Sequence, residues 1–318
     1  MNRPTKATRA GQTFLALRGE ANSAGRATAE YLRLYALEGF LLRLAASPHR
    51  DRFVLKGGVL LAAYDLRRPT ADVDLAALAT PNEVEPVRNL VAAIAATPLP
   101  ADSDDGLTFD LSDVRAETIR EGDQYSGVRV RLVATLATAR EPFHVDVNIG
   151  DPIWPGPVEV SLPRLLETDP IHLRGYPMEM VLAEKIVTAL QRGQASTRWR
   201  DFGDIYQITG RRTFRAGDIR RTLQAVADFR RAALPTLDEL LDGYAVIGQP
   251  RWAPWRARLQ LTGLLPAEFA NALDALRTFA NPILSGSVAD TATWDPDSRM
   301  WQSSQVPAGR RRRQQQDS

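Results

Sequence analysis

Two aspartates separated by one residue, Asp72 and Asp74, are the side chains of this sequence best suited to bind a divalent cation. They lie in residues 70–78, where the residue pattern predicts a β-strand. In a strand, side chains i and i+2 share a face and lie about 6.5 Å apart at the backbone. Two such carboxylates can share Mg²⁺ (or Mn²⁺), which leaves coordination positions for waters and phosphates. The alternative is a solvated strand edge.

A glycine pair precedes these aspartates, and thirteen residues separate it from Asp72. Gly57 and Gly58 follow the apolar run 53–55, and glycine allows a sharp turn and a close approach of the backbone to a phosphate. Lys56 beside them supplies a point charge suited to a triphosphate. The alternatives are a plain strand-to-helix turn and a surface lysine.

A third carboxylate comes from a second segment of alternating residues, 143–149, which predicts a strand with His144, Asp146 and Asn148 on one face. Neighbouring strands lie about 4.8 Å apart. Asp146 would therefore reach the same metal if its strand lies beside that of Asp72, either as a ligand or as a general base. The competing interpretation is an aspartate at a sheet edge.

The clearest helical periodicity spans residues 178–192 and places Lys185 on the apolar face. A lysine there either extends its ammonium to water or binds a phosphate. Asp201 and Asp204 follow near a predicted helix start, where an aspartate often caps backbone N–H groups.

Taken in order, these segments resemble the DNA polymerase β-like nucleotidyltransferase superfamily, and more narrowly the AbiEii/AbiGii toxin family of bacterial toxin–antitoxin and phage-defence systems. The resemblance covers about residues 28–283, and within the family the sequence is close to the actinobacterial members that modify tRNA. It rests on FVLKGG at 53–58, R-x-T-x-DVD at 68–74, HVDVNIGD at 144–151, and AEK at 183–185 followed by TRWRDFGDIY at 197–206.

The resemblance implies an α/β (α+β) nucleotidyltransferase fold with a mixed, mostly antiparallel sheet, followed by an α-helical domain. It implies transfer of a nucleoside monophosphate from an NTP to RNA, at the 3′ end of tRNA in several members, which blocks translation. It also implies Mg²⁺ (or Mn²⁺) as cofactor and a cognate antitoxin protein as partner.

The resemblance also implies roles for individual residues. Lys185 would hold the triphosphate, and Asp201 would orient that lysine or the nucleotide, whereas we assign Asp204 to structure. Arg200 stands where the family usually has a lysine, which preserves the charge. The implied metal ligands are Asp72, Asp74 and Asp146; the nucleotide-binding residues are Lys56, Gly57, Gly58, Arg68, Thr70 and Lys185; the catalytic residues are Asp72, Asp74, Asp146, Lys185 and Asp201.

Other segments must position these residues. Helical spacing predicts helices at 27–46, 59–66 and 83–96, and alternation predicts a strand at 128–133. Beyond residue 205 we expect a helical bundle, built from 217–233, 237–244 and 266–279, with Trp252 and Trp255 in its core rather than stacking on bases.

Four parts are expected along the chain. They are a flexible basic lead-in (1–26), the nucleotidyltransferase domain (27–161), an α-helical domain that supplies Lys185 and Asp201 to the site (162–284), and a disordered tail (285–318).

Composition narrows the class of protein. The 318 residues, 44% of them hydrophobic, are enough for two domains with real cores. The absence of cysteine excludes disulfides and thiolate chemistry, and the three histidines disfavour a histidine-based metal site. We find neither a signal-peptide core nor a membrane-spanning run, so we expect a cytoplasmic protein, and a monomer.

The charge is unevenly distributed, although the net charge is only +2. Ten arginines face four aspartates between Arg192 and Arg231, and the tail carries the block 310–313. Such stretches suit a polyanion such as RNA, or form a solvated helix face. Conversely, the acidic stretch 102–123 predicts a surface loop and edge strand.

Two other functional classes stay open. A nucleotidyltransferase or kinase-like NTP-dependent enzyme that acts on a protein or small molecule would keep the acidic site and need no basic surface. A non-catalytic module that binds RNA or an antitoxin would need neither the metal nor Asp72.

Overall fold

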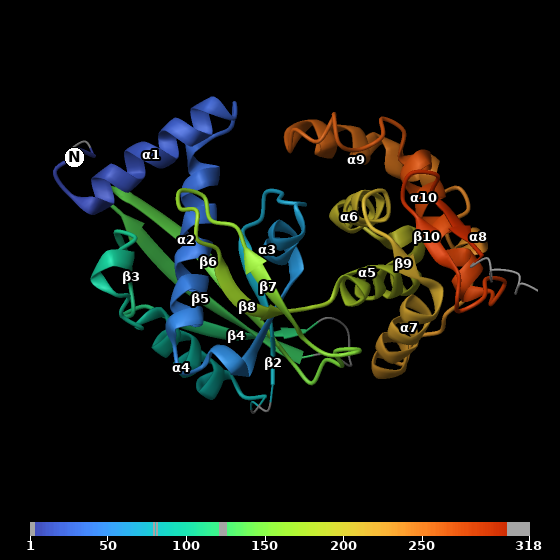
Figure 1. Ribbon diagram of the computed structural model, residues 1–318, viewed down its shortest axis with the longest axis horizontal. Helices are drawn as coiled ribbons and strands as arrows, with labels where there is room; N and C mark the ends of the chain where they lie inside the picture. The colour runs from blue at the N-terminus through green and yellow to red at the C-terminus, as the bar shows by residue number, and fades with distance from the viewer. Residues whose placement is uncertain (1–3, 79, 81, 121–125, 304–318) are drawn as a thin grey trace, which may run out of the picture. The chain divides into compact units, whose positions relative to one another are not determined.

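The computed structural model describes residues 4–78, 80, 82–120 and 126–303 (Figure 1). The chain forms two compact units. The first comprises Met1–Val187 with Thr222–Ala233, and the second comprises Thr188–Arg221 with Leu234–Ser318. The arginine block at 310–313 lies outside the described residues.

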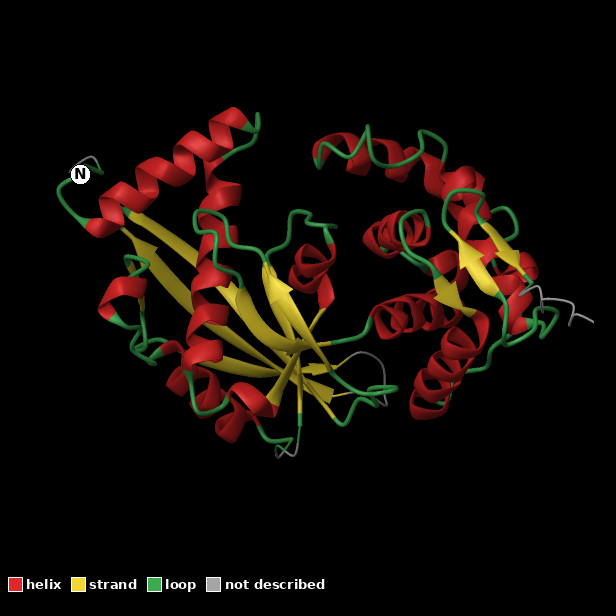
Figure 2. Cartoon of the chain, in the orientation of Figure 1, coloured by secondary structure: helices red, strands yellow, loops and turns green. Residues whose placement is uncertain are grey.

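An eight-stranded sheet is the framework of the first unit (Figure 2). Its order is β3-β5-β6-β2-β1-β8-β7, with β4 paired to β5. The pairs β2–β6 and β1–β8 are parallel and the other pairs antiparallel, which confirms the mixed, mostly antiparallel sheet. The strands are β1 (Phe53–Lys56), β2 (Asp72–Ala77), β3 (Leu107–Phe109), β4 (Arg115–Arg120), β5 (Ser126–Leu136), β6 (Ala139–Ile149), β7 (Val158–Leu162) and β8 (Ile171–Gly175).

Helices α1 (Arg9–Ser23), α2 (Thr28–Ala46) and α4 (Val84–Ala95) pack on this sheet, α2 against β6 and β8 and α4 against β4 and β5. The alternating residues of the central strands supply the core, since Val73 and Val145 are fully buried. Because the apolar side chains of β2 and β6 are buried on one face of the sheet, the residues between them must lie on the opposite face.

The glycine pair forms the turn between β1 and the short helix α3 (Gly57–Leu60), which continues into a 3₁₀ turn at Leu61–Tyr64. Gly57 has a φ of 66°, in the left-handed region that is strained for residues with a Cβ. Glycine is therefore the residue that suits this turn.

Two helices contribute to both units. Helix α5 (Met178–Arg192) begins in the first unit, and the later half of α7 (Ala216–Arg230) also belongs to the first unit.

The second unit consists mainly of helices α6 (Trp199–Thr209), α8 (Leu237–Leu240), α9 (Tyr244–Arg258) and α10 (Phe269–Leu284). Its core contains an aromatic cluster in which Trp252 and Phe202 lie 5.1 and 5.3 Å from the ring of Phe269. Trp252 is fully buried and Trp255 is 9% exposed, so both belong to the core as predicted. A small sheet of β9 (Phe214–Arg215), β10 (Thr293–Asp295) and β11 (Met300–Gln302) completes this unit.

Three expectations about the parts of the chain differ from this structure. The flexible lead-in contains the helix α1, which buries Leu17 and Ala21. Strands β7 and β8 extend the sheet beyond residue 161, where we expected the catalytic domain to end, because β8 pairs with β1. The tail expected to be disordered forms β10 and β11, with Trp294 buried.

Within the described part of the acidic stretch, residues 102–120, Asp105 differs from the expected surface position. Asp105 is only 1% exposed, because both of its carboxylate oxygens accept hydrogen bonds from the guanidinium of Arg43, at 2.6 and 3.1 Å. Among the residues described, no helix combines the length and apolar character needed to cross a bilayer.

Candidate active site

The parallel pairing of β2 with β6 brings the predicted acidic residues together. In this register Asp72 lies opposite His144, and Asp74 lies opposite Asp146. Because side chains alternate along a strand, all four point to one face of the sheet, while Val73 and Val145 point to the other. The prediction that the two strands are neighbours is confirmed.

Three of these side chains form a group that could hold a metal ion. Ligand atoms of Asp72, His144 and Asp146 all lie within 4.8 Å of one another. Asp72 and His144 are 24% and 26% exposed, so solvent reaches the group. Two carboxylates and an imidazole fit a divalent cation. The presence of only three histidines in the sequence disfavoured a histidine-based metal site. The position of His144 beside Asp72 depends on the register of β2 and β6, which composition does not reveal.

Asp74 lies partly buried in this part of the sheet, with its carboxylate against Gly57. Burial and the neighbouring charge of Asp72 raise the pKa of Asp74 to about 7, although Lys56 and the backbone N–H of Gly58 act to lower it. Asp74 thus connects the glycine turn to the acidic strand, which explains why the two motifs occur together. In the part of the chain that is described, the group within 4.8 Å does not include Asp74.

Asp146 is held by an arginine that sequence reasoning missed. Arg129 on β5 lies opposite Asp146 and donates from Nε and Nη2 to both carboxylate oxygens, at 2.8 and 2.7 Å. This two-pronged contact fixes the carboxylate plane and offsets part of its charge. The alternating pattern of residues 128–133 predicted the strand but not which arginine faces the acids.

Thr70 and Arg68, which we predicted to bind the nucleotide, lie at the glycine turn. Thr70 donates from Oγ1 to Asp72 Oδ1 at 2.7 Å, and both Thr70 and Arg68 are only 8% exposed. A Cβ added to Gly58 would come within 2.7 Å of Thr70 Oγ1 and 3.1 Å of an Arg68 nitrogen. The backbone at Gly58 is therefore packed directly against these two side chains.

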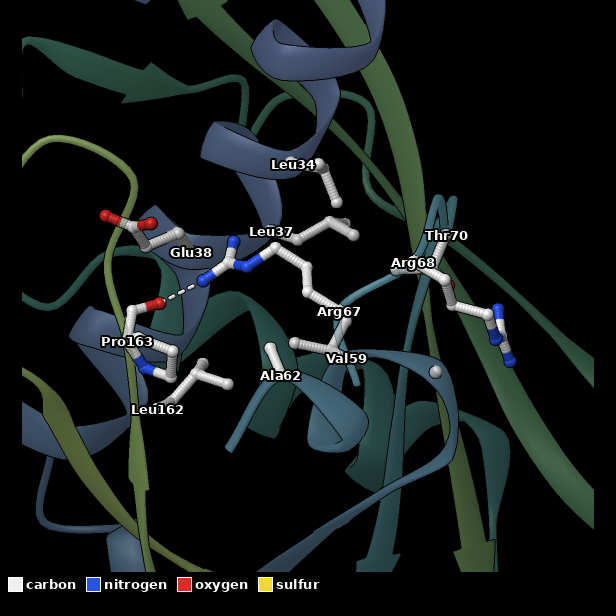
Figure 3. Close-up of a pocket in the computed structure, with 11 residues that line it drawn as sticks. Leu34, Leu37, Glu38, Val59, Ala62, Arg67, Arg68, Thr70, Leu162 and Pro163 are labelled. Atoms are coloured by element: carbon white, nitrogen blue, oxygen red, sulfur yellow. Dashed lines mark hydrogen bonds between the residues drawn. The ribbon is translucent and has the colours of Figure 1, made fainter. Parts of the chain in front are cut away.

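A pocket lies behind this turn, between it and helix α2 (Figure 3). Arg67 points across the pocket and donates to the carbonyl of Pro163, whereas Arg68 points the opposite way (Figure 3). Both arginines line the pocket, but only Arg67 extends its guanidinium across it. Its lining is mainly apolar and includes Leu34, Leu37, Val59, Ala62 and Leu162.

Lys56 occupies a buried ion cluster. Its ammonium lies 2.8 Å from Asp151 Oδ2 and 2.8 Å from Glu184 Oε1, and the residue is 7% exposed. Burial alone would lower the pKa of Lys56, but Glu184, Tyr176 and Asp151 raise it well above the ordinary value. Both carboxylates were missed, although Glu184 stands beside Lys185 in the predicted motif.

Arg230 completes this cluster from helix α7, with Nη2 3.6 Å from Glu184 Oε1. Burial would raise the pKa of Glu184, but Lys56 and Arg230 lower it below its ordinary value. Glu184 is therefore held as a carboxylate between two cations.

The two remaining predicted residues lie in different units. Lys185 is on α5 within the first unit, so it belongs to the unit of the sheet and not to a following domain. Asp201 is in the first turn of α6 in the second unit, and its Oδ2 lies 3.9 Å from Arg198 Nη1. Asp204 is 3% exposed, in agreement with the structural role we assigned to it.

No curated protein matches the chain. The crystal structure of JHP933 from Helicobacter pylori is 16% identical, covering 79% of this chain and 89% of that one with a TM-score of 0.44. A candidate nucleotidyltransferase from H. pylori is 17% identical, covering 79% and 92% with a TM-score of 0.43.

One family model, the nucleotidyl transferase AbiEii toxin of type IV toxin–antitoxin systems, matches residues 39–282. This span contains the glycine turn, both acidic strands, Lys185 and Asp201. The chain therefore belongs to the AbiEii toxin family of nucleotidyltransferases.

Proposed function

We propose that this nucleotidyltransferase transfers a nucleoside monophosphate from an NTP to RNA, at the 3′ end of tRNA, in a reaction that requires Mg²⁺ or Mn²⁺. The observation that carries the proposal is the convergence of Asp72, His144 and Asp146 on one face of the sheet, beside the glycine turn. Modification of that RNA end would block aminoacylation and hence translation, which suits a toxin.

The acidic residues have a defined task in this scheme. Asp72 and Asp146 would hold the cation, and Asp74 adds negative charge next to them. A bound divalent cation would supply charge neutralisation on the phosphates and help lower the pKa of the attacking 3′-hydroxyl. Asp146, oriented by Arg129, would accept a hydrogen bond from that hydroxyl or take its proton.

The basic residues would bind the triphosphate. Arg68 at the glycine turn and Lys185 on α5 would supply positive charge, whereas the backbone N–H of Gly58 donates to Asp74 and so holds the turn against the acidic strand. Nucleotidyl transfer depends mainly on positioning and on electrostatic stabilisation of the phosphates. We propose that Asp201 is also needed for catalysis. Lys56, held by two carboxylates, would act by fixing the turn.

The arginines of the second unit favour RNA as the acceptor. Arg211, Arg215 and Arg221 are exposed, and polyanions bind to such surfaces. The family also implies an antitoxin as a protein partner. We propose that the protein acts in the cytoplasm as a monomer.

The direct experiment incubates the protein with each α-³²P-labelled NTP in turn, total tRNA and either Mg²⁺ or Mn²⁺, and detects labelled RNA on a gel. We expect label from one or more NTPs in wild type, none with Asp72→Ala, and none after chelation. Asp51→Ala, an aspartate away from the acidic strands, is the control and should label RNA like wild type. Labelling of RNA by Asp72→Ala at the wild-type rate would refute the assignment.

The choice of acceptor is tested separately. Changing Arg211, Arg215 and Arg221 to glutamate should reduce RNA labelling and its dependence on salt concentration. An unchanged rate would instead favour a protein or small-molecule acceptor. A γ-labelled NTP identifies kinase-like transfer, because only that reaction would leave the γ-phosphate on the product.

A further inference from the structure

His144 lies where a ligand of the cation would lie. It faces Asp72 across the parallel β2–β6 pair, with Nε2 3.7 Å from Asp72 Oδ2. That distance exceeds the range of a hydrogen bond. It is within the roughly 4.2 Å that two ligands of one ion can span when each lies about 2.1 Å from it. The two side chains are thus spaced as joint ligands rather than as a hydrogen-bonded pair.

The third member of the group also lies close, because ligand atoms of Asp72, His144 and Asp146 are all within 4.8 Å of one another. Asp146 also accepts two hydrogen bonds from Arg129, and Asp74, which is partly buried, lies against the glycine turn. The side chains of Asp72 and His144 are 24% and 26% exposed, so a cation can reach both from solvent. Arg131, which lies opposite His144 on β5, is directed to Glu117 at 2.5 Å.

The chemistry of the donors predicts which ion is preferred. Mg²⁺ takes oxygen ligands almost exclusively, whereas imidazole nitrogen suits ions of the first transition series. A site that replaces one carboxylate by an imidazole should therefore lose affinity for Mg²⁺ relative to Mn²⁺.

We propose that His144 is a direct ligand of the divalent cation and that it shifts the selectivity of the site toward Mn²⁺. The inference rests on the proposed function, because it refines the same metal site. It adds a residue to which the sequence gave no role, and it is measured by metal binding rather than by activity.

The experiment uses tag-free full-length protein with Mn²⁺ alone, without nucleotide or RNA. Pulsed EPR detects the modulation that a directly bound imidazole ¹⁴N produces on the Mn²⁺ signal. We expect this modulation in wild type and in His172→Gln, and its loss in His144→Gln. His172 is the matched control because it is an exposed histidine on β8 that contacts Ser161.

Binding constants provide the second measurement. Continuous-wave EPR counts free Mn²⁺, and competition with Mg²⁺ gives the ratio of the two affinities. We expect His144→Gln to weaken Mn²⁺ binding at least about tenfold. His144→Asp, which makes the group all-carboxylate, should shift the Mn²⁺/Mg²⁺ ratio toward Mg²⁺ by at least about tenfold.

The outcomes separate this inference from the proposed function. Mn²⁺ that binds to wild type and is lost in Asp72→Asn, but shows no nitrogen modulation, overturns the role of His144 and leaves the metal-dependent enzyme in place. Mn²⁺ binding that is undetectable in wild type, or unchanged in Asp72→Asn, overturns the metal site and the proposed function with it.

Discussion

The carboxylate of Asp74 fills the space that a side chain at Gly57 would occupy. A Cβ built on Gly57 would overlap Asp74 Oδ2, and Gly57 also has a φ of 66°. Glycine is thus required at this position for two independent reasons, one steric and one conformational. The glycine turn and the acidic strand are a single packed unit.

Gly57→Ala should therefore displace Asp74 and the turn together. We expect transfer activity to fall by about 100-fold, since small displacements of reacting groups have effects of that size, and stability to fall by about 1–3 kcal/mol. Gly25→Ala is the control, because Gly25 has a similar φ of 64° and nothing within 4 Å of its added Cβ. Labelling assays and urea denaturation of both variants measure the difference; equal activities in the two would contradict the steric argument.

The two lysines of the predicted site should respond differently to mutation. Lys56→Met leaves Asp151 and Glu184 buried without their shared cation, so it should destabilise the fold by about 3–5 kcal/mol. Lys185→Met should change stability by about 1 kcal/mol or less and raise the KM for the NTP. Thermal unfolding combined with steady-state kinetics separates the two. A Lys56→Met protein of normal stability with a raised KM would instead support direct contact with the triphosphate.

Arg129 should position Asp146, whereas its neighbour Arg131 should not. Arg129→Leu removes both hydrogen bonds to Asp146, and we expect a loss of activity of about 10- to 100-fold. Arg131 pairs with Glu117, and both side chains are more than half exposed, so Arg131→Leu should leave activity near wild type. Rates of RNA labelling at saturating NTP compare the two variants, and similar losses in both would indicate a general charge effect.

Glu38 gives the fold an unusual dependence on pH. Burial raises the pKa of Glu38 above its ordinary 4.5, although Leu165 N–H and Arg164 act to lower it. The folded protein then binds more protons than the unfolded chain, so this contribution to stability is present below pH 4.5 and is lost as pH rises through the folded pKa. Urea denaturation of wild type and Glu38→Gln across this range should show that the free energy of unfolding of wild type falls, relative to that of Glu38→Gln, as pH rises. A difference that stays constant or reverses would contradict this.

Periodicity predicted the elements that carry the acids. Strands β2 and β6 were predicted from alternation, because one face of each is buried against the core, and helix α2 from its recurring apolar residues, although its residues 35–41 are buried on all sides. Helix α9 was missed because Pro250 and Pro254 lie inside it, and proline normally marks a helix boundary.

The contacts between distant residues could not be predicted. Nothing in the pattern near Lys56 indicates that Asp151 and Glu184 surround it, since the three meet only when β1, α5 and the segment after β6 come together. The role of His144 likewise depends on the register that sets it opposite Asp72. Alternation showed that His144 and Asp146 share a face, but register is a property of the pair of strands.

The return of residues 222–233 to the first unit limits how this protein can be divided. A polypeptide that stops after Val187 would lack Arg230, and Glu184 would lose one of the two cations that hold it. Neither proteolytic trimming nor gene truncation at that point would yield a self-sufficient catalytic half.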